Sequence, residues 1–141
     1  MRKELQLRLA KEYRYAVNKM QESQQPAQKL FYFSVFFGEA QRVLNFEWDR
    51  DLALIYTVTQ HVHTQFNTTM QIPALGVFPV GWENIFDKLL RVSSELASYY
   101  EKKESDISRG EMYKTLGRLA EIAYAVSGNG SYLFEKGILK L

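Results

Sequence analysis

His61 and His63 are the only histidines of the chain, and they form a His-x-His pair that could take part in metal chemistry. On a β-strand the two imidazoles would lie on one face and could share an ion. On an α-helix they would point about 200° apart, so a shared ion would need tertiary ligands. The nearest carboxylates, Glu47, Asp49 and Asp51, could reach such a site only through folding. A metal-dependent enzyme is therefore one hypothesis, and two hydrogen-bonded histidines in a polar interior or interface are the simpler one.

Other patterns of catalytic residues are missing from the sequence. There is no cysteine, which excludes disulfides, thiolate zinc sites and thiol nucleophiles. The glycine patterns that cradle phosphates or place a nucleophilic serine are absent, as are the Glu-x-x-His motifs of ferritin-like di-iron proteins. The short Arg-to-His spacing of helical HEPN-type ribonucleases is absent too. We therefore expect a protein that is not an enzyme, with no cofactor and no small-molecule substrate.

Positive charge is concentrated in the first segment of the chain. Residues 1–23 contain six of the 18 basic residues but only three of the 16 acidic ones. On a helix over residues 2–23, four of these cations would lie opposite the apolar side and could follow a phosphate backbone. Two further pairs of cations could extend that surface. The predicted nucleic-acid-binding residues are Arg8, Lys11, Arg14, Lys19, Lys88, Arg91, Lys114 and Arg118.

The same cations also have a simpler explanation. A charged helix face is usually solvated, and its residues pair with acids that lie one turn away on the same helix. Arg8 could pair in this way with Glu4, and Arg118 with Glu121. Under this alternative the cations stabilise single helices and bind no ligand.

Three segments with helical periodicity would position these side chains. Residues 2–23 carry a single apolar stripe, residues 82–104 are clearly amphipathic, and a Ser-x-x-Glu capping box at Ser108 and Glu111 opens a last helix. Gly128-Asn129-Gly130 would end that helix. The residues expected to face the core are Leu5, Leu9, Tyr13, Ala16, Val17 and Met20 in the first segment, Ile85, Phe86, Leu89, Val92, Leu96 and Tyr100 in the second, and Met112, Leu116, Leu119, Ala123 and Val126 in the third.

Residues 27–47 are apolar nearly all round, which is typical of a helix covered on every side. Pro26 suits the first turn of this helix because its ring fixes φ and its missing N–H is not needed there. Ser34 and Gly38 are small and lie one turn apart, so a neighbouring helix could approach closely at this point. The segment is therefore predicted to be a central helix.

Residues 50–71 fit two kinds of secondary structure. Read as a helix, the segment aligns Leu52, Ile55, Thr59, Val62 and Phe66 on one face. Read as a strand, it alternates and is rich in β-branched residues, but a lone long strand needs a partner. Helix is the favoured prediction. The apolar, proline- and glycine-containing residues 72–81 then form a connector.

From Leu52 to Trp82 the chain contains no charged residue, yet it is rich in Thr, Gln, Asn and His. This composition suits a place that is shielded from bulk water but rich in hydrogen-bond partners. Together with the apolar residues 27–47, this composition indicates that the second helix (27–47) and the third helix (50–71) are the innermost helices of the bundle. It also indicates surplus apolar surface that contacts another subunit, either a different protein or a copy of this chain.

The whole chain, residues 1–141, is expected to form one domain of the all-α class, a five-helix bundle with a short apolar C-terminal tail at 131–141. The N-terminus lacks the apolar core of a signal peptide, and no run of apolar residues is long enough for a membrane span. We therefore expect a cytoplasmic protein that does not contact a membrane.

This organisation resembles the small-subunit family of CRISPR effector (Cascade-type) complexes. The features that carry the resemblance are the basic residues Arg8, Lys11, Arg14 and Lys19, the capped helix at Ser108 and Glu111, and the number of helices. The resemblance implies a non-catalytic helical subunit that stacks on neighbouring subunits and contacts the backbone of RNA or DNA. The alternatives are a dimerising interaction module without nucleic acid, and the histidine-based metal enzyme.

Overall fold

The helical periodicity of the sequence is realised in a computed structural model, which describes residues 1–71, 82–102 and 109–126, except for the side chains of residues 70, 71 and 82. The predicted connector at 72–81, the cap at Ser108, the helix stop at 128–130 and the tail at 131–141 lie outside the described residues. The described helices are α1 (Lys3–Glu22), α2 (Pro26–Phe33), α3 (Val35–Leu44), α4 (Arg50–Gln71), α5 (Trp82–Glu101) and α6 (Arg109–Val126).

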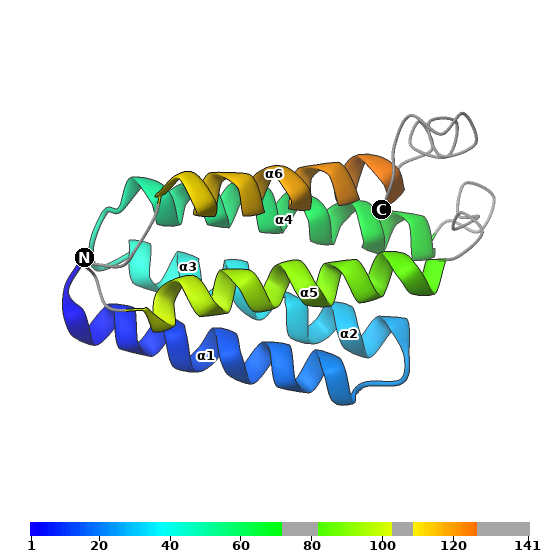
Figure 1. Cartoon of the computed structure of the whole chain (residues 1–141), viewed down its shortest axis with the longest axis horizontal. Coiled ribbons are helices and arrows are strands. Elements are labelled where there is room, and N and C mark those ends of the chain that lie inside the picture. Colours follow the sequence, from blue (N-terminus) through cyan, green and yellow to red (C-terminus); the bar gives the residue numbers. More distant parts are fainter. Residues whose placement is uncertain (72–81, 103–108, 127–141) are drawn as a thin grey trace.

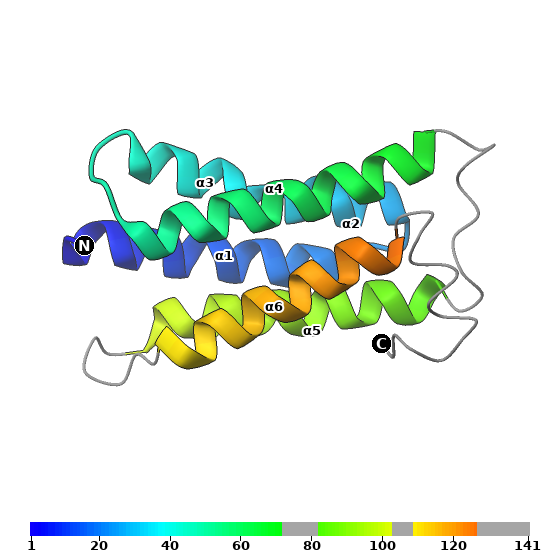
Figure 2. The ribbon, with the colours of Figure 1, turned by 90° about the horizontal axis from the view of Figure 1, so that it is seen from above.

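The helices lie side by side as an up-and-down bundle, with α2 and α3 as two halves of one segment (Figure 1). Around the bundle, α1 packs against α5, α5 against α6, α6 against α4, α4 against α3, and α3 back against α1. Figure 2 shows α5 and α6 together on the side of the bundle away from α2 and α3. The prediction of an all-α bundle is confirmed, and residues 50–71 are helix rather than strand.

The predicted inward faces of the helices form the core. Every residue expected to face inward on α1, α4, α5 and α6 is buried except Leu5, which is half-buried. At the centre, the Tyr13 hydroxyl donates to the carbonyl of Phe36 across 2.9 Å, and the Tyr13 ring contacts those of Phe36 and Tyr100. This contact joins α1, α3 and α5. Burial raises the pKa of the Tyr13 hydroxyl far above its usual range, so it remains a neutral donor.

The predicted second helix is interrupted at Ser34, which separates α2 from α3. The Ser34 hydroxyl donates to the carbonyl of Phe31, which in an uninterrupted helix accepts the N–H four residues on. Pro26 occupies the first turn of α2, as expected. The expectation of a close helix neighbour at Gly38 is wrong for the described chain, because a Cβ at this position would meet nothing within 4 Å.

The prediction that residues 27–47 and 50–71 form the innermost helices is wrong. On α4 the buried residues follow a single stripe, while polar side chains such as Gln60, His61 and Thr64 are exposed. Phe31 on α2 and Phe46 and Trp48 after α3 are exposed as well. The α2–α3 segment and α4 therefore each have one side that faces solvent. No helix in the described part of the chain is both long and apolar enough to cross a bilayer.

Candidate functional site

The two histidines do not face a common point, because α4 is a helix. His61 is exposed, whereas His63 is half-buried and its ring lies 5.2 Å from that of Phe37 on α3. Burial lowers the pKa of His63 from its ordinary value. Within the described residues, no group of three or more metal-ligating side chains comes together. His63 therefore packs at the α3–α4 contact, and the geometry offers the pair no shared ion.

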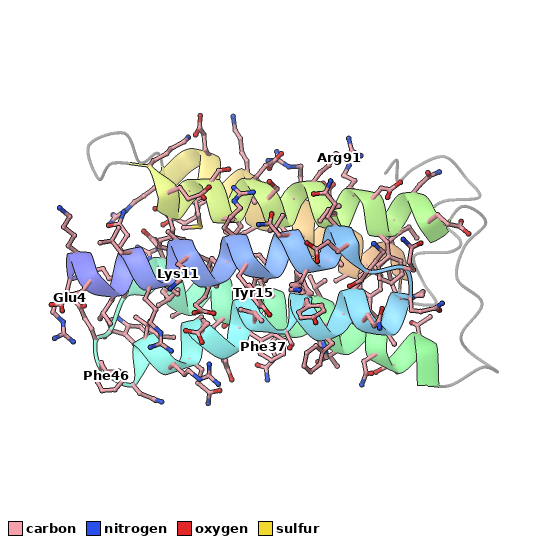
Figure 3. The ribbon with its side chains drawn as sticks, turned by 90° about the horizontal axis from the view of Figure 1, so that it is seen from below. Glu4, Lys11, Tyr15, Phe37, Phe46 and Arg91 are labelled. Atoms are coloured by element: carbon pink, nitrogen blue, oxygen red, sulfur yellow. The ribbon has the colours of Figure 1, made fainter. Side chains whose placement is uncertain are left out.

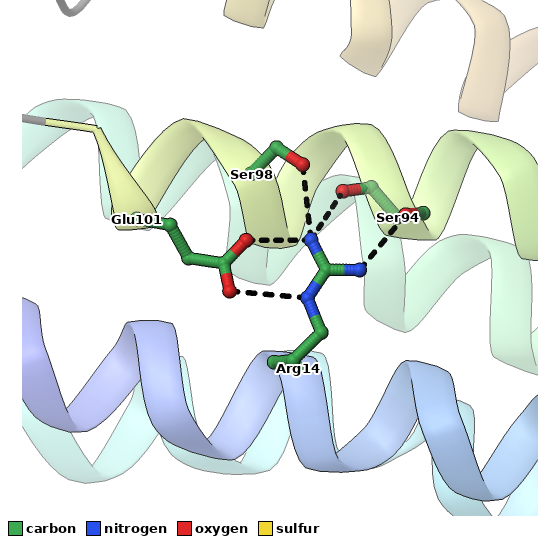
Figure 4. Close-up of polar contacts among 4 residues, drawn as sticks. All are labelled: Arg14, Ser94, Ser98 and Glu101. Atoms are coloured by element: carbon green, nitrogen blue, oxygen red, sulfur yellow. Dashed lines mark hydrogen bonds and ion pairs between the residues drawn. The ribbon is translucent and has the colours of Figure 1, made fainter.

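Arg14 on α1 spans the contact with α5 (Figure 4). Its Nε donates to Oε2 of Glu101 at 3.1 Å and its Nη2 donates to Oε1 at 2.6 Å, which makes a bidentate ion pair. Nη1 and Nη2 also donate to the hydroxyls of Ser94 and Ser98, each at 3.0 Å. All three guanidinium nitrogens are thus used within the chain. Arg14 joins two helices, and its donors are not free for phosphate.

Arg8 on α1 pairs with Glu39 on α3 and not with Glu4. The Glu39 side chain is only 3% exposed, and it accepts from Arg8 Nε at 2.9 Å and from Arg42. Burial alone would raise the pKa of Glu39, but the hydrogen bonds and charges of the two arginines hold it below its ordinary value of 4.5. The buried acid therefore positions both guanidinium groups.

The other two predicted cations of α1 differ from each other. Lys19 pairs with Glu22 at 3.5 Å and lies over the ring of Tyr15 at 5.8 Å. Lys11 is exposed and has no ion pair with another described residue; Figure 3 shows it beside Tyr15 on the outer side of α1. Of the four predicted cations of α1, only Lys11 has no ion pair with a described residue.

The cations of α5 and α6 come together in a different way. Arg91, Lys114 and Arg118 line one groove of about 400 Å³ between the two helices, and Lys102 lines it as well. We call this the α5–α6 groove. Figure 3 shows Arg91 projecting outward from α5. Lys88 is half-buried on α5 and does not line the groove. The structure thus places three of the eight predicted residues at one concave site.

Two acids also line the α5–α6 groove and pair with two of its cations. Glu95 accepts from Arg118 and from the hydroxyl of Thr115, and Glu111 lies 3.3 Å from the ammonium of Lys102. The Nε of Arg118 is buried and has no hydrogen-bond partner among the described residues. Arg91 and Lys114 are exposed and have no ion pair with another described residue. The groove therefore carries an excess of positive charge.

A second candidate surface is aromatic. Phe31 on α2 is 67% exposed, and Phe46 and Trp48, which follow α3, are each 76% exposed. We call Phe46 and Trp48 the aromatic surface; Figure 3 shows Phe46 at the end of α3. Beside Phe46, a depression of about 200 Å³ is lined by residues that include Leu5, Arg8 and Val43. The sequence shows that residues 27–47 are apolar nearly all round, but only the helix packing shows which of the aromatic side chains are exposed.

Asp51 is a residue whose role the sequence analysis missed. It is 8% exposed at the start of α4, where it accepts from the Tyr113 hydroxyl at 3.0 Å and pairs with Arg109 Nε at 3.0 Å. Both partners belong to α6, so the bonds join the ends of α4 and α6. Because the partners lie far along the chain, no local spacing in the sequence indicates them.

The chain matches no protein-family model, no curated protein and no solved structure. The α5–α6 groove and the aromatic surface are therefore the features that bear on its function.

Proposed function

We propose that the chain is a non-catalytic helical subunit of a larger nucleoprotein assembly. In this role the aromatic surface packs against a neighbouring subunit, and cations on the surface lie near nucleic-acid backbone. This is also the role that the resemblance to CRISPR effector small subunits implies, and membership of that family is part of the proposal.

The exposure of Phe46 and Trp48 carries the proposal. Large aromatic side chains left in water forgo a substantial apolar contribution to stability, and such residues anchor many protein interfaces. The adjacent arginines, Arg8 and Arg42, are held by Glu39 and would lose little side-chain freedom on binding. An apolar contact with guanidinium groups beside it is typical of the energetic centre of an interface.

The test uses the tagged chain purified from its own cells and native mass spectrometry. The native chain should be recovered in a complex of defined mass and stoichiometry. The variant Phe46→Ser/Trp48→Ser should be recovered as free chain with an unchanged far-UV spectrum, because both side chains lie outside the core. The control is Tyr124→Ser, at an exposed residue of α6, and this variant should be recovered in the same complex as the native chain. Recovery of the native chain as a monomer would contradict the proposal.

The principal alternative is a protein-interaction module that binds no nucleic acid. The observation that favours nucleic acid is the α5–α6 groove, where Arg91 and Lys114 face solvent without an acidic partner among the described residues. The metal-enzyme alternative has less support, because His61 and His63 diverge around α4.

A further inference from the structure

We infer that the α5–α6 groove is a phosphate-binding site, and that it, rather than the basic side of α1, is where the chain contacts nucleic acid. The inference rests on the nucleic-acid part of the proposed function and gives it a location. The phosphates could belong to a polynucleotide backbone or to a free nucleotide. The groove recognises the chemistry that these ligands share.

Charge supports this assignment. Two of the four lining cations, Arg91 and Lys114, are exposed and unpaired within the described chain, and they extend from the two helices that form the groove. The two acids of the groove are already bonded to Lys102 and Arg118. Among the described lining residues, a phosphate between α5 and α6 would therefore meet an excess of two positive charges. On α1, by contrast, Arg8 and Arg14 each form an ion pair with an acid of a neighbouring helix.

Hydroxyl groups supply the second part of the argument. Ser94 and Ser98 line the groove on successive turns of α5, and the oxygen of each accepts a hydrogen bond from Arg14. Each hydroxyl accepts one hydrogen bond from Arg14 on the side facing α1, so its O–H group is suited to donate to an anion. Phosphate oxygens accept bonds of this kind from serine hydroxyls, arginines and lysines. Arg14 thus contributes indirectly, by positioning two donors.

Arg118 could also donate hydrogen bonds to an anion in the groove. Its contact with Glu95 leaves Nε buried without a partner among the described residues, whereas Arg14 uses all three nitrogens. The Arg118–Glu95 pair is also partly exposed, with side chains 37% and 47% accessible. Partly exposed pairs contribute little to stability, so exchanging this carboxylate for a phosphate costs the fold little.

Within the described part of the chain, the groove contains no exposed aromatic ring on which a base could stack. Tyr99, the one aromatic residue that lines it, is 9% exposed. Recognition would therefore depend on phosphates rather than on bases, and binding should be insensitive to nucleotide sequence.

The test measures binding of the full chain to three probes, which are inorganic phosphate, ATP and a 20-nucleotide single-stranded RNA, at low salt. Amide NMR resonances of Arg91, Ser94, Ser98 and Lys114 should shift on titration. The variant Arg91→Gln/Lys114→Gln should bind RNA at least roughly tenfold more weakly at 50 mM salt, because two phosphate contacts are lost. Both residues are exposed, so the variant should fold normally.

The matched control is Lys11→Gln/Arg50→Gln, which removes the same charge from two exposed cations away from the groove. This variant should bind RNA like the native chain. Equal weakening in both variants, or unchanged binding by the groove variant, would overturn the inference and leave the proposed contact with nucleic acid standing. Binding of none of the probes would overturn both. Shifts at the groove with ATP or phosphate but not with RNA would support a phosphate site and reject a polynucleotide as its ligand.

Discussion

The cations of α1 and those of α5 and α6 resemble each other in sequence but have different surroundings in the fold. On α1, Arg14 is bonded to Glu101 and two serines of α5, and Arg8 is bonded to the buried Glu39 of α3. In the α5–α6 groove, Arg91 and Lys114 face solvent. The first pair joins helices within the bundle, whereas the second is available to a ligand. A basic residue therefore indicates a binding surface only when its tertiary partner is known.

The largest effect expected on stability comes from Arg14. The change Arg14→Gln removes a bidentate ion pair and bonds to two hydroxyls, so the free energy of unfolding should fall by about 1–2 kcal/mol after allowance for partial exposure. Urea denaturation of the native chain and of Arg14→Gln at pH 7 measures this difference in unfolding free energy.

Lys11→Gln, on the same helix, is the matched control for Arg14. Because Lys11 is exposed and unpaired within the described chain, this change should alter the free energy of unfolding by less than about 0.5 kcal/mol. Equal losses of unfolding free energy in Arg14→Gln and Lys11→Gln would show that the bonded Arg14 stabilises the fold no more than the unpaired Lys11 does.

A smaller effect is expected at acidic pH from Glu39. Its pKa is held below 4.5 in the folded chain, so its ionised form stabilises the fold above that pH and the contribution disappears as pH falls through the folded pKa. The difference in unfolding free energy between the native chain and Glu39→Gln should therefore be largest near neutral pH and should shrink below pH 4.5.

Denaturation curves between pH 7 and pH 3.5 would measure the effect of Glu39. Arg91→Gln, a substitution at an exposed residue, serves as the control and should follow the pH trend of the native chain. A difference between native and Glu39→Gln chains that stays constant over this range would show that Arg8 and Arg42 do not hold the carboxylate as described.

The sequence predicts the helices well because periodicity reports directly on which side of a helix is buried. Every residue predicted to face inward on α5 and α6 is buried, although buried residues such as Ala97 and Ile122 were not among them. The periodicity of α4 left strand as an alternative because its β-branched residues fit both structures. The periodicity also could not show that one side of α4 faces solvent. Neutral polar residues such as Gln60 and Thr64 are compatible with a buried polar environment as well as with solvent.

The site was harder to predict, because its distinguishing feature is the identity of partners distant in sequence. The expected partner of Arg8 was Glu4 and that of Arg118 was Glu121, both on the same helix. The structure pairs them instead with Glu39 and Glu95, on neighbouring helices. Spacing within one helix carries no information about such contacts. The α5–α6 groove is formed by two separate helices, and only their packing brings Arg91 and Lys114 together.

The most direct test of the contrast between the two regions is the salt dependence of RNA binding. The logarithm of the association constant for single-stranded RNA should be measured against the logarithm of salt concentration for the native chain, the α1 variant Arg8→Gln/Lys11→Gln and the groove variant Arg91→Gln/Lys114→Gln, at a temperature where all are folded. We expect the slope to become shallower by about 1.4 in the groove variant and to stay unchanged in the α1 variant. A shallower slope in the α1 variant with an unchanged slope in the groove variant would contradict the account.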